Sequence, residues 1–143
     1  MAAEVEIVQQ SGVPLEQLAD WARARILESA ARFLYEEGAE ALAASQDVVP
    51  VDTGTLRASA TEVGVNIEEG GDEVSVLIGY GGAAREYALI IHEVPTEEFS
   101  EETQQRRAAM GTGHKYLERP VFERAEGLEA RAAAYIRADL ERR

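Results

Sequence analysis

One short segment of the sequence has the residue types and spacing of a catalytic turn. Val51-Asp52-Thr53-Gly54-Thr55 places an apolar residue before Asp-Thr-Gly and a hydroxyl residue after it, and Val76-Leu77-Ile78-Gly79 imitates the apolar-apolar-Gly segment that supports such a turn. Two turns of this kind, one from each half of a dimer, hold two aspartates so close that they share a proton. The chemistry that this pattern predicts is acid–base hydrolysis of a peptide bond by Asp52.

The elements expected around the turn favour a structural role instead. Retroviral-type, homodimeric aspartic proteases are almost entirely β, whereas here one long helix precedes the turn and another closes the chain. In the structural interpretation Pro50 stiffens the chain, Asp52 and Thr53 cap backbone donors, and Gly54 adopts a conformation that side chains disfavour. We therefore predict that Asp52, Thr53 and Gly54 form a structural turn, and keep the protease as the alternative function.

No other chemistry-bearing pattern is complete. His92-Glu93 resembles the start of a zinc-binding helix motif, but Thr96 stands where the second histidine belongs and Pro95 interrupts the helix. The only other histidine is His114, there is no cysteine, and neither a serine nucleophile elbow nor a phosphate-binding loop occurs. We predict no catalytic residue, no metal site and no cofactor.

Charge is the most unusual feature of the composition. The 143 residues include 27 acidic and 14 basic side chains, which give a formal net charge of −13. Residues 62–105 hold eleven acidic residues and one basic residue, Arg85, whereas residues 106–143 hold nine basic and six acidic residues. DNA should repel so acidic a chain. The asymmetry predicts either pairing within the chain or, in a ring of copies, subunit surfaces of opposite sign.

Length and hydropathy set the organisation of the chain. The length predicts one domain over residues 1–143. The start, Met1-Ala2-Ala3-Glu4, lacks the order of a signal peptide, and no apolar run approaches the roughly 20 residues of a membrane span.

Two helices and a hairpin are expected. The spacing predicts a helix over residues 14–46 that bends or ends near Gly38, and a second helix opened by Pro120. Their apolar stripes, expected to face the core, are Leu15, Leu18, Ala22, Ile26, Ala30 and Phe33 in the first helix, and Val121, Ala125, Leu128, Ala132, Ile136 and Leu140 in the second. Alternation over residues 63–67 and 74–78 around Glu69-Gly70-Gly71-Asp72 predicts a β-hairpin.

The remaining segments are less regular. Tyr87–Val94 is too short for periodicity to choose between helix and strand. Residues 95–113 are poor in apolar side chains and predict a long flexible or partner-ordered loop. The result is an α+β fold, in which a long N-terminal helix and a C-terminal helix pack on a small antiparallel sheet.

The order of four segments resembles the tail-completion or neck proteins of long-tailed bacteriophages, also labelled head-tail joining or minor capsid proteins. In that family a P-V-D-T-G-x-L-R-x-S segment follows the first helix, a strand leads into Y-A-x-x-x-E, and F/Y-L-x-P begins the final helix. The matching segments here are Val49–Ser59, Ile78-Gly79-Tyr80, Tyr87–Glu93 and Lys115–Val121. The likeness covers about residues 14–140. Two positions depart from it, since His92-Glu93-Val94-Pro95 replaces a frequent E-F-G-T and Glu118-Arg119 precede Pro120.

The resemblance implies a non-enzymatic virion component. It implies a homo-oligomeric, hexameric ring that joins the tail to the head connector, contacts connector or adaptor proteins and tail-terminator or tail-tube proteins, and lets DNA pass without specific binding. Such a protein is made in the host cytoplasm, ends in the phage neck and involves no membrane. We hypothesise that acidic residues between Glu62 and Glu102 face the channel or an adjacent ring.

Eight side chains are the predicted subunit or partner contacts of this assembly role. They are Arg57, Glu97, Glu98, Phe99, Glu101, Glu102, Arg106 and Arg107. A third interpretation, which the sequence does not separate from the ring, is an acidic adaptor for a basic protein.

Overall fold

The structure, a computed structural model, describes residues 12–67 and 72–142, with the side chains of residues 62–65 left aside. The predictions for Met1–Glu4, for the turn residues 69–71 and for the Glu62 side chain fall outside these residues. The elements in chain order are α1 (Leu15–Val48), α2 (Thr55–Ala58), β1 (Ala60–Ile67), β2 (Val74–Tyr80), the 3₁₀ turn η1 (Gly82–Ala84), α3 (Arg85–Glu93), the 3₁₀ turn η2 (Thr96–Glu98), α4 (Glu101–Met110), α5 (Glu118–Ala125) and α6 (Leu128–Glu141).

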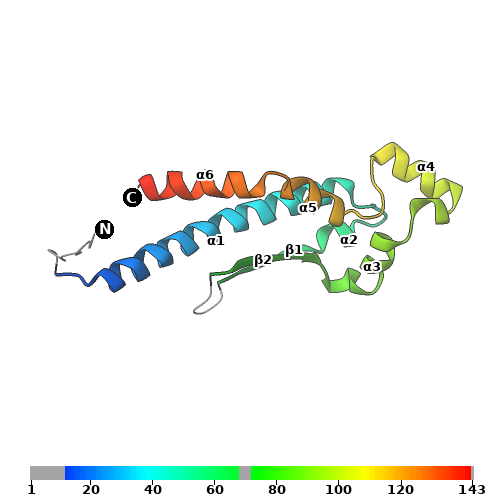
Figure 1. The fold of residues 1–143 in the computed structure, drawn as a ribbon. Coiled ribbons are helices and arrows are strands. Elements are labelled where there is room, and N and C mark those ends of the chain that lie inside the picture. Colours follow the sequence, from blue (N-terminus) through cyan, green and yellow to red (C-terminus); the bar gives the residue numbers. More distant parts are fainter. Residues whose placement is uncertain (1–11, 68–71, 143) are drawn as a thin grey trace, which may run out of the picture.

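Helix α1 is the central element of the molecule. The sheet lies along one side of it, and α5 and α6 lie along the other (Figure 1). At 1.5 Å per residue, its 34 residues span about 50 Å. The predicted α+β class is confirmed, and α1 lies between the C-terminal helix and the sheet.

Helix α1 does not end at Gly38. Gly38 is buried inside α1, and the helix continues for ten residues to Val48. A glycine in a helix costs about 1 kcal/mol relative to alanine. The buried side chains on both sides of it, Phe33, Ala41 and Leu42, offset that cost by packing against neighbouring elements.

The sheet has two antiparallel strands. Ala60 pairs with Tyr80 at one end and Ile67 with Val74 at the other, and an irregularity between Glu62 and Gly64 shifts the register by one residue. The β-hairpin predicted from the alternation of apolar and polar residues is therefore confirmed.

The predicted loop over residues 95–113 is wrong, because most of that segment is ordered as η2 and α4. The Ser100 hydroxyl accepts a hydrogen bond from the Thr103 amide at 3.3 Å, and Glu101 and Glu102 occupy the first turn, where the helix dipole favours acidic groups. Gly111, at φ 68°, ends the helix. Local capping, rather than an apolar stripe, defines α4.

The final helix predicted from Pro120 is two helices. Pro120 is the third residue of α5 and is buried, and Gly127, at φ 67°, separates α5 from α6. A residue with a side chain disfavours that angle, so the glycine allows the chain to change direction here. Tyr87–Val94, which periodicity left open, is mostly helix α3.

The largest cluster of buried apolar residues that the structure describes lies at the C-terminal end of α1. Tyr116 is 2% exposed and Val49 is fully buried, and they pack with Leu56, Ala84 and Ala88. The Tyr116 hydroxyl donates to the Ala88 carbonyl oxygen at 2.8 Å. Burial, with a smaller contribution from Tyr80, raises the pKa of Tyr116 to about 12. The hydroxyl therefore stays a proton donor at neutral pH.

The predicted stripe of α1 is only partly covered. Phe33 is 5% exposed, but Leu15 is 57%, Leu18 52% and Ile26 44% exposed. The expectation that the whole stripe faces the core is wrong for these residues. Helix α1 extends past the sheet, so the hairpin does not cover its first turns (Figure 1).

Candidate assembly surface

The Asp-Thr-Gly segment forms a tight turn between α1 and α2. Gly54, at φ 85°, precedes the first residue of α2, and the Thr53 hydroxyl accepts a hydrogen bond from the Thr55 amide at 3.4 Å. Val49 before the turn and Leu56 after it are both buried in the core. The predicted structural turn is therefore present and is fixed at both ends.

The capping role predicted for Asp52 is wrong. Among the described residues no group hydrogen-bonds to its exposed side chain, and the residue before α2 is Gly54, which has no side chain to cap with. Thr53 is the only one of the two predicted capping side chains that accepts a backbone hydrogen bond.

The left-handed conformation of Gly54 gives a first testable prediction. Gly54→Ala should lower the free energy of unfolding by about 1–2 kcal/mol, because a Cβ disfavours positive φ, and nothing lies within 4 Å to add a clash. Thermal unfolding should show a drop of about 4 °C or more. Gly79→Ala is the control, since its added Cβ also meets open space but its φ is ordinary. An equal effect of both variants would contradict this explanation.

A groove of about 490 Å³ opens beside the turn. We call it the turn groove; its walls are the Pro50–Gly54 turn, α3 and α4. Apolar side chains make up much of its surface, and hydroxyl and guanidinium groups lie among them. The lining residues are Pro50, Val51, Asp52, Thr53, Gly54, Leu56, Tyr87, Ile91, Phe99, Thr103, Arg106, Arg107, Met110 and Thr112.

Arg107 is the most unusual residue of the turn groove. It is 4% exposed, its guanidinium carbon lies 4.2 Å from the centre of the Phe99 ring, and its Nη1 donates to the Thr96 hydroxyl at 3.0 Å. Burial, with the nearby charge of Arg106, lowers its pKa. No carboxylate of the described residues forms an ion pair with it. The groove thus holds a buried cation with unused donors.

A second polar group in the groove has no hydrogen-bond partner at all among the described residues. It is the hydroxyl oxygen of Thr112, which is buried. A buried polar group without a partner costs about 1–3 kcal/mol, so Thr112 and Arg107 together favour a ligand that carries an acceptor such as a carboxylate.

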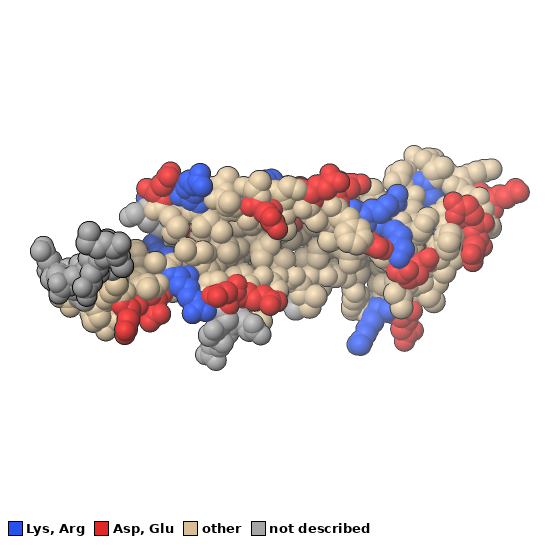
Figure 2. Space-filling model, in the orientation of Figure 1, with Lys and Arg blue, Asp and Glu red and all other residues tan. Residues whose placement is uncertain are grey.

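The structure brings together some of the predicted contact residues and separates others. Phe99, Arg106 and Arg107 line the turn groove together with the Asp52–Gly54 turn. Glu97, Glu98, Glu101 and Glu102 are exposed on η2 and on the first turn of α4. Figure 2 shows acidic side chains gathered at the end of the molecule that carries α4.

Arg57 lies on α2, outside the turn groove. Its Nη2 is 3.7 Å from a carboxylate oxygen of Asp47, and its backbone carbonyl accepts a hydrogen bond from Gln46 Nε2 at 3.1 Å. These contacts hold α2 against the last turns of α1.

Several groove residues were not predicted as contacts, among them Tyr87, Ile91, Met110 and Thr112. Tyr87 and Ile91 belong to the Tyr87–Val94 apolar run. The sequence identified this run but did not indicate its secondary structure. Nothing in the sequence distinguishes Met110 and Thr112 from surface residues.

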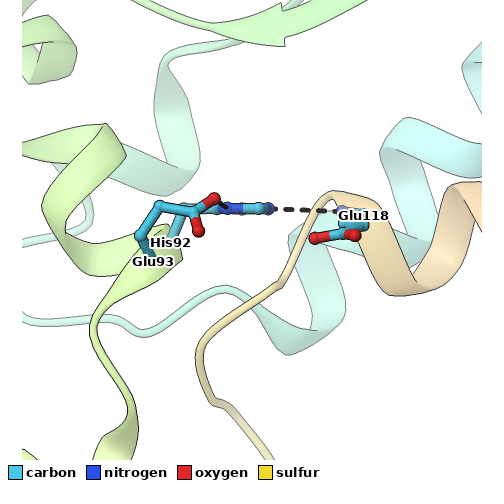
Figure 3. A group of neighbouring side chains, drawn as sticks. All are labelled: His92, Glu93 and Glu118. Carbon is cyan, nitrogen blue, oxygen red and sulfur yellow. Dashed lines mark hydrogen bonds and ion pairs between the residues drawn. The ribbon is translucent and has the colours of Figure 1, made fainter.

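His92, Glu93 and Glu118 form a second polar cluster (Figure 3). The His92 ring lies between Glu93 on α3 and the first residue of α5. The Glu118 amide donates to His92 Nε2 at 3.3 Å, and His92 Nδ1 is 2.7 Å from a Glu93 carboxylate oxygen. The tautomer that fits both contacts carries a ring proton on Nδ1, facing the Glu93 carboxylate, and accepts the Glu118 N–H at Nε2.

Lys115 supplies the positive charge of this cluster. Its ammonium lies 2.7 Å from Glu93 and 2.8 Å from Glu118. Hydrogen bonds from Lys115 and then His92 lower the pKa of Glu93, and the bonds to Glu118 and then Glu93 raise the pKa of Lys115. A metal ion would have to displace this ammonium and the Glu118 amide. These contacts connect the end of α3 to the start of α5.

Comparison of the chain with protein-family models, with curated proteins and with solved structures finds no match. Among the helices that the structure describes, none combines the length and apolar character needed to cross a membrane.

Proposed function

We propose that this chain is a structural, non-enzymatic neck protein of a long-tailed bacteriophage. It assembles as a homo-oligomeric, hexameric ring that joins the tail to the head connector, and it reaches its place in the virion from the host cytoplasm. The proposal starts from the motif order that resembles tail-completion proteins.

The observation that carries the proposal is the convergence of the four motif segments. Val49 and Leu56 come from the first segment, Tyr80 from the second, Ala88 from the third and Tyr116 from the fourth. All five lie in or against one hydrophobic core. The residues that carry the resemblance are therefore also residues that determine the fold, which supports a common fold with the neck proteins.

The surface of the chain also favours assembly. Large apolar side chains lie on this surface, and Leu77 at 62% and Phe122 at 65% exposure line the same hollow between β2 and α5. Apolar surface of this kind is typical of proteins that bury it against a partner.

The negative net charge of the chain favours a ring through which DNA passes. A net charge of −13 opposes binding to phosphates, so DNA passes such a ring without adhering to it. Connector, adaptor, tail-terminator or tail-tube proteins are the expected partners above and below the ring. We infer that part of the acidic cluster between Glu62 and Glu102 faces the channel or one of these rings.

The deciding experiment is the mass and symmetry of the particle. Native mass spectrometry of the purified protein and electron microscopy of isolated virions should show a sixfold ring in the neck. Phe122→Asp should prevent ring formation while leaving the circular dichroism spectrum unchanged, and Glu123→Gln, at the adjacent exposed position, should assemble normally. Virions that lack the protein would refute the proposal, and a soluble complex with a basic protein but no ring would favour the adaptor.

Asp52→Asn tests the aspartic-protease alternative. Asp52 lies on an exposed turn between two helices, so we expect no peptide cleavage by the wild type or by the variant. The measurement is release of peptides from denatured casein between pH 4 and 7. Cleavage by the wild type that disappears in Asp52→Asn would establish the protease instead.

A further inference from the structure

We propose that the turn groove of one copy binds the acidic segment Met1–Ser11 of another copy. The inference deepens the proposed ring, from which it takes only the presence of a second copy. It names the contact that links two neighbouring subunits.

The chemistry of the groove selects its ligand. Leu56, Tyr87 and Met110 offer apolar surface. Arg107, 4% exposed, donates to the Thr96 hydroxyl but forms no ion pair with a carboxylate of the described residues. The buried hydroxyl of Thr112 has no hydrogen-bond partner among those residues, and the exposed Arg106 adds a second positive charge at the same groove. A buried charge without an opposite charge beside it is unfavourable, and a carboxylate placed there relieves the cost. A fitting ligand therefore carries acidic and apolar side chains close together.

Residues 1–11 have this composition. Their sequence, MAAEVEIVQQS, contains Glu4 and Glu6, the apolar residues Val5, Ile7 and Val8, and no basic residue. Acidic and apolar side chains alternate over residues 4–7. A groove of about 490 Å³ is in the size range that holds a few side chains of a peptide.

Chain length directs this segment to another copy. Helix α1 begins at Leu15. Helices α3 and α4, whose residues line the turn groove, lie past its other end (Figure 1). Helix α1 spans about 50 Å, whereas eleven residues from Glu4 to Leu15 reach at most about 40 Å when fully extended. The segment therefore falls short of the groove in its own chain, and only a neighbouring chain can supply it.

The test is a titration of the full-length protein with a peptide of residues 1–11 that carries a fluorescent label at its C-terminal end. At concentrations where the protein is monomeric, the groove is open and fluorescence anisotropy should show saturable binding. Two altered peptides, Glu4→Gln/Glu6→Gln and Val5→Ser/Ile7→Ser, should each bind at least tenfold more weakly. Peptide changes leave the fold of the protein untouched.

Protein variants locate the site. Met110 is 49% exposed in the groove, so Met110→Asp should keep the fold and weaken peptide binding at least tenfold through repulsion and loss of apolar contact. Leu89→Asp is the matched control, because Leu89 is 68% exposed on α3 and does not line the groove. Equal loss in both variants, or no binding at millimolar peptide, would overturn the proposal.

A photo-crosslinker at position 7 of the full-length chain gives an independent readout. In a mixture of isotopically light and heavy protein at assembling concentrations, it should link residue 7 of one copy to groove residues of another. Links confined to one copy, or to other surfaces, would refute the inference while a ring still forms. Peptide binding in a protein that forms no ring would leave the groove assignment standing and remove the neck function.

Discussion

Replacing Tyr116 by alanine is expected to lower the free energy of unfolding by about 3–5 kcal/mol. Its ring is 2% exposed and meets the rings of Tyr80 and His92, each with centroids 5.0 Å away in an edge-to-face arrangement. A domain is typically stable by only about 5–15 kcal/mol. The variant should therefore unfold at much lower urea concentration, followed by circular dichroism at 222 nm.

Tyr116→Phe separates the ring from its hydroxyl. This variant keeps the aromatic contacts and loses only the hydrogen bond to the Ala88 carbonyl, so we expect a loss of about 1 kcal/mol. If alanine were no worse than phenylalanine, the hydrogen bond and not the packing would hold the four motif segments together.

Glu37→Gln is the second substitution with a large expected effect. The Glu37 carboxylate accepts two hydrogen bonds from Arg124, both at 3.1 Å, and one from Arg131 at 2.9 Å, and its side chain is 15% exposed. It thereby connects α1 to both α5 and α6. Removing the charge takes the carboxylate partner away from both arginines, and we expect a loss of about 2 kcal/mol at pH 7.

The same carboxylate makes stability depend on pH. Burial works to raise the pKa of Glu37, but the hydrogen bonds from Arg131 and Arg124 outweigh it and hold the pKa below its ordinary value of 4.5. The unfolded chain therefore takes up this proton first as the pH falls. Its stabilisation is complete above about pH 5 and is lost as the pH falls below 4.5 through the folded pKa.

Urea unfolding between pH 7 and pH 3 measures both effects of Glu37. Glu37→Gln should be less stable than the wild type at pH 7, and the two curves should converge toward pH 3. Glu40→Gln is the control, because Glu40 is an exposed residue of the same helix. Parallel curves for wild type and Glu37→Gln would show that another group causes the pH dependence.

Local signals in the sequence predicted much of the fold. The helix expected over residues 14–46 is observed as Leu15–Val48, and the alternation around residues 63–78 is the β1–β2 hairpin. These elements follow from periodicity within each segment. The exposure of Leu15 and Leu18 was not predictable in this way, because it depends on where the neighbouring elements stop.

The candidate site was predictable only in pieces. The sequence singled out the Asp52–Gly54 turn and the residues Phe99, Arg106 and Arg107, but gave no reason to place them in one groove. Helix α4 forms one wall of the groove. The helix has too few apolar residues to form an apolar stripe, so periodicity did not predict it. The burial of Arg107 likewise results from the packing of α4 against Thr96 and Phe99.

Part of the charge asymmetry is resolved by pairing within the chain. Arg124 and Arg131 from the basic C-terminal region bind Glu37 of α1, and Lys115 binds Glu93 of the acidic middle region. Only the charges that remain exposed are left to form subunit faces of opposite sign.

The placement of α6 against α1 has a consequence for synthesis of the protein. Arg32 and Asp139 bond at 2.7 Å but are 107 residues apart in the chain. A ribosome adding about 5–20 residues per second needs about 5–20 s to make that stretch. During this interval the face of α1 that α6 covers has no partner from its own chain. Newly made chains therefore pass through a stage in which chaperones or neighbouring chains compete for this face.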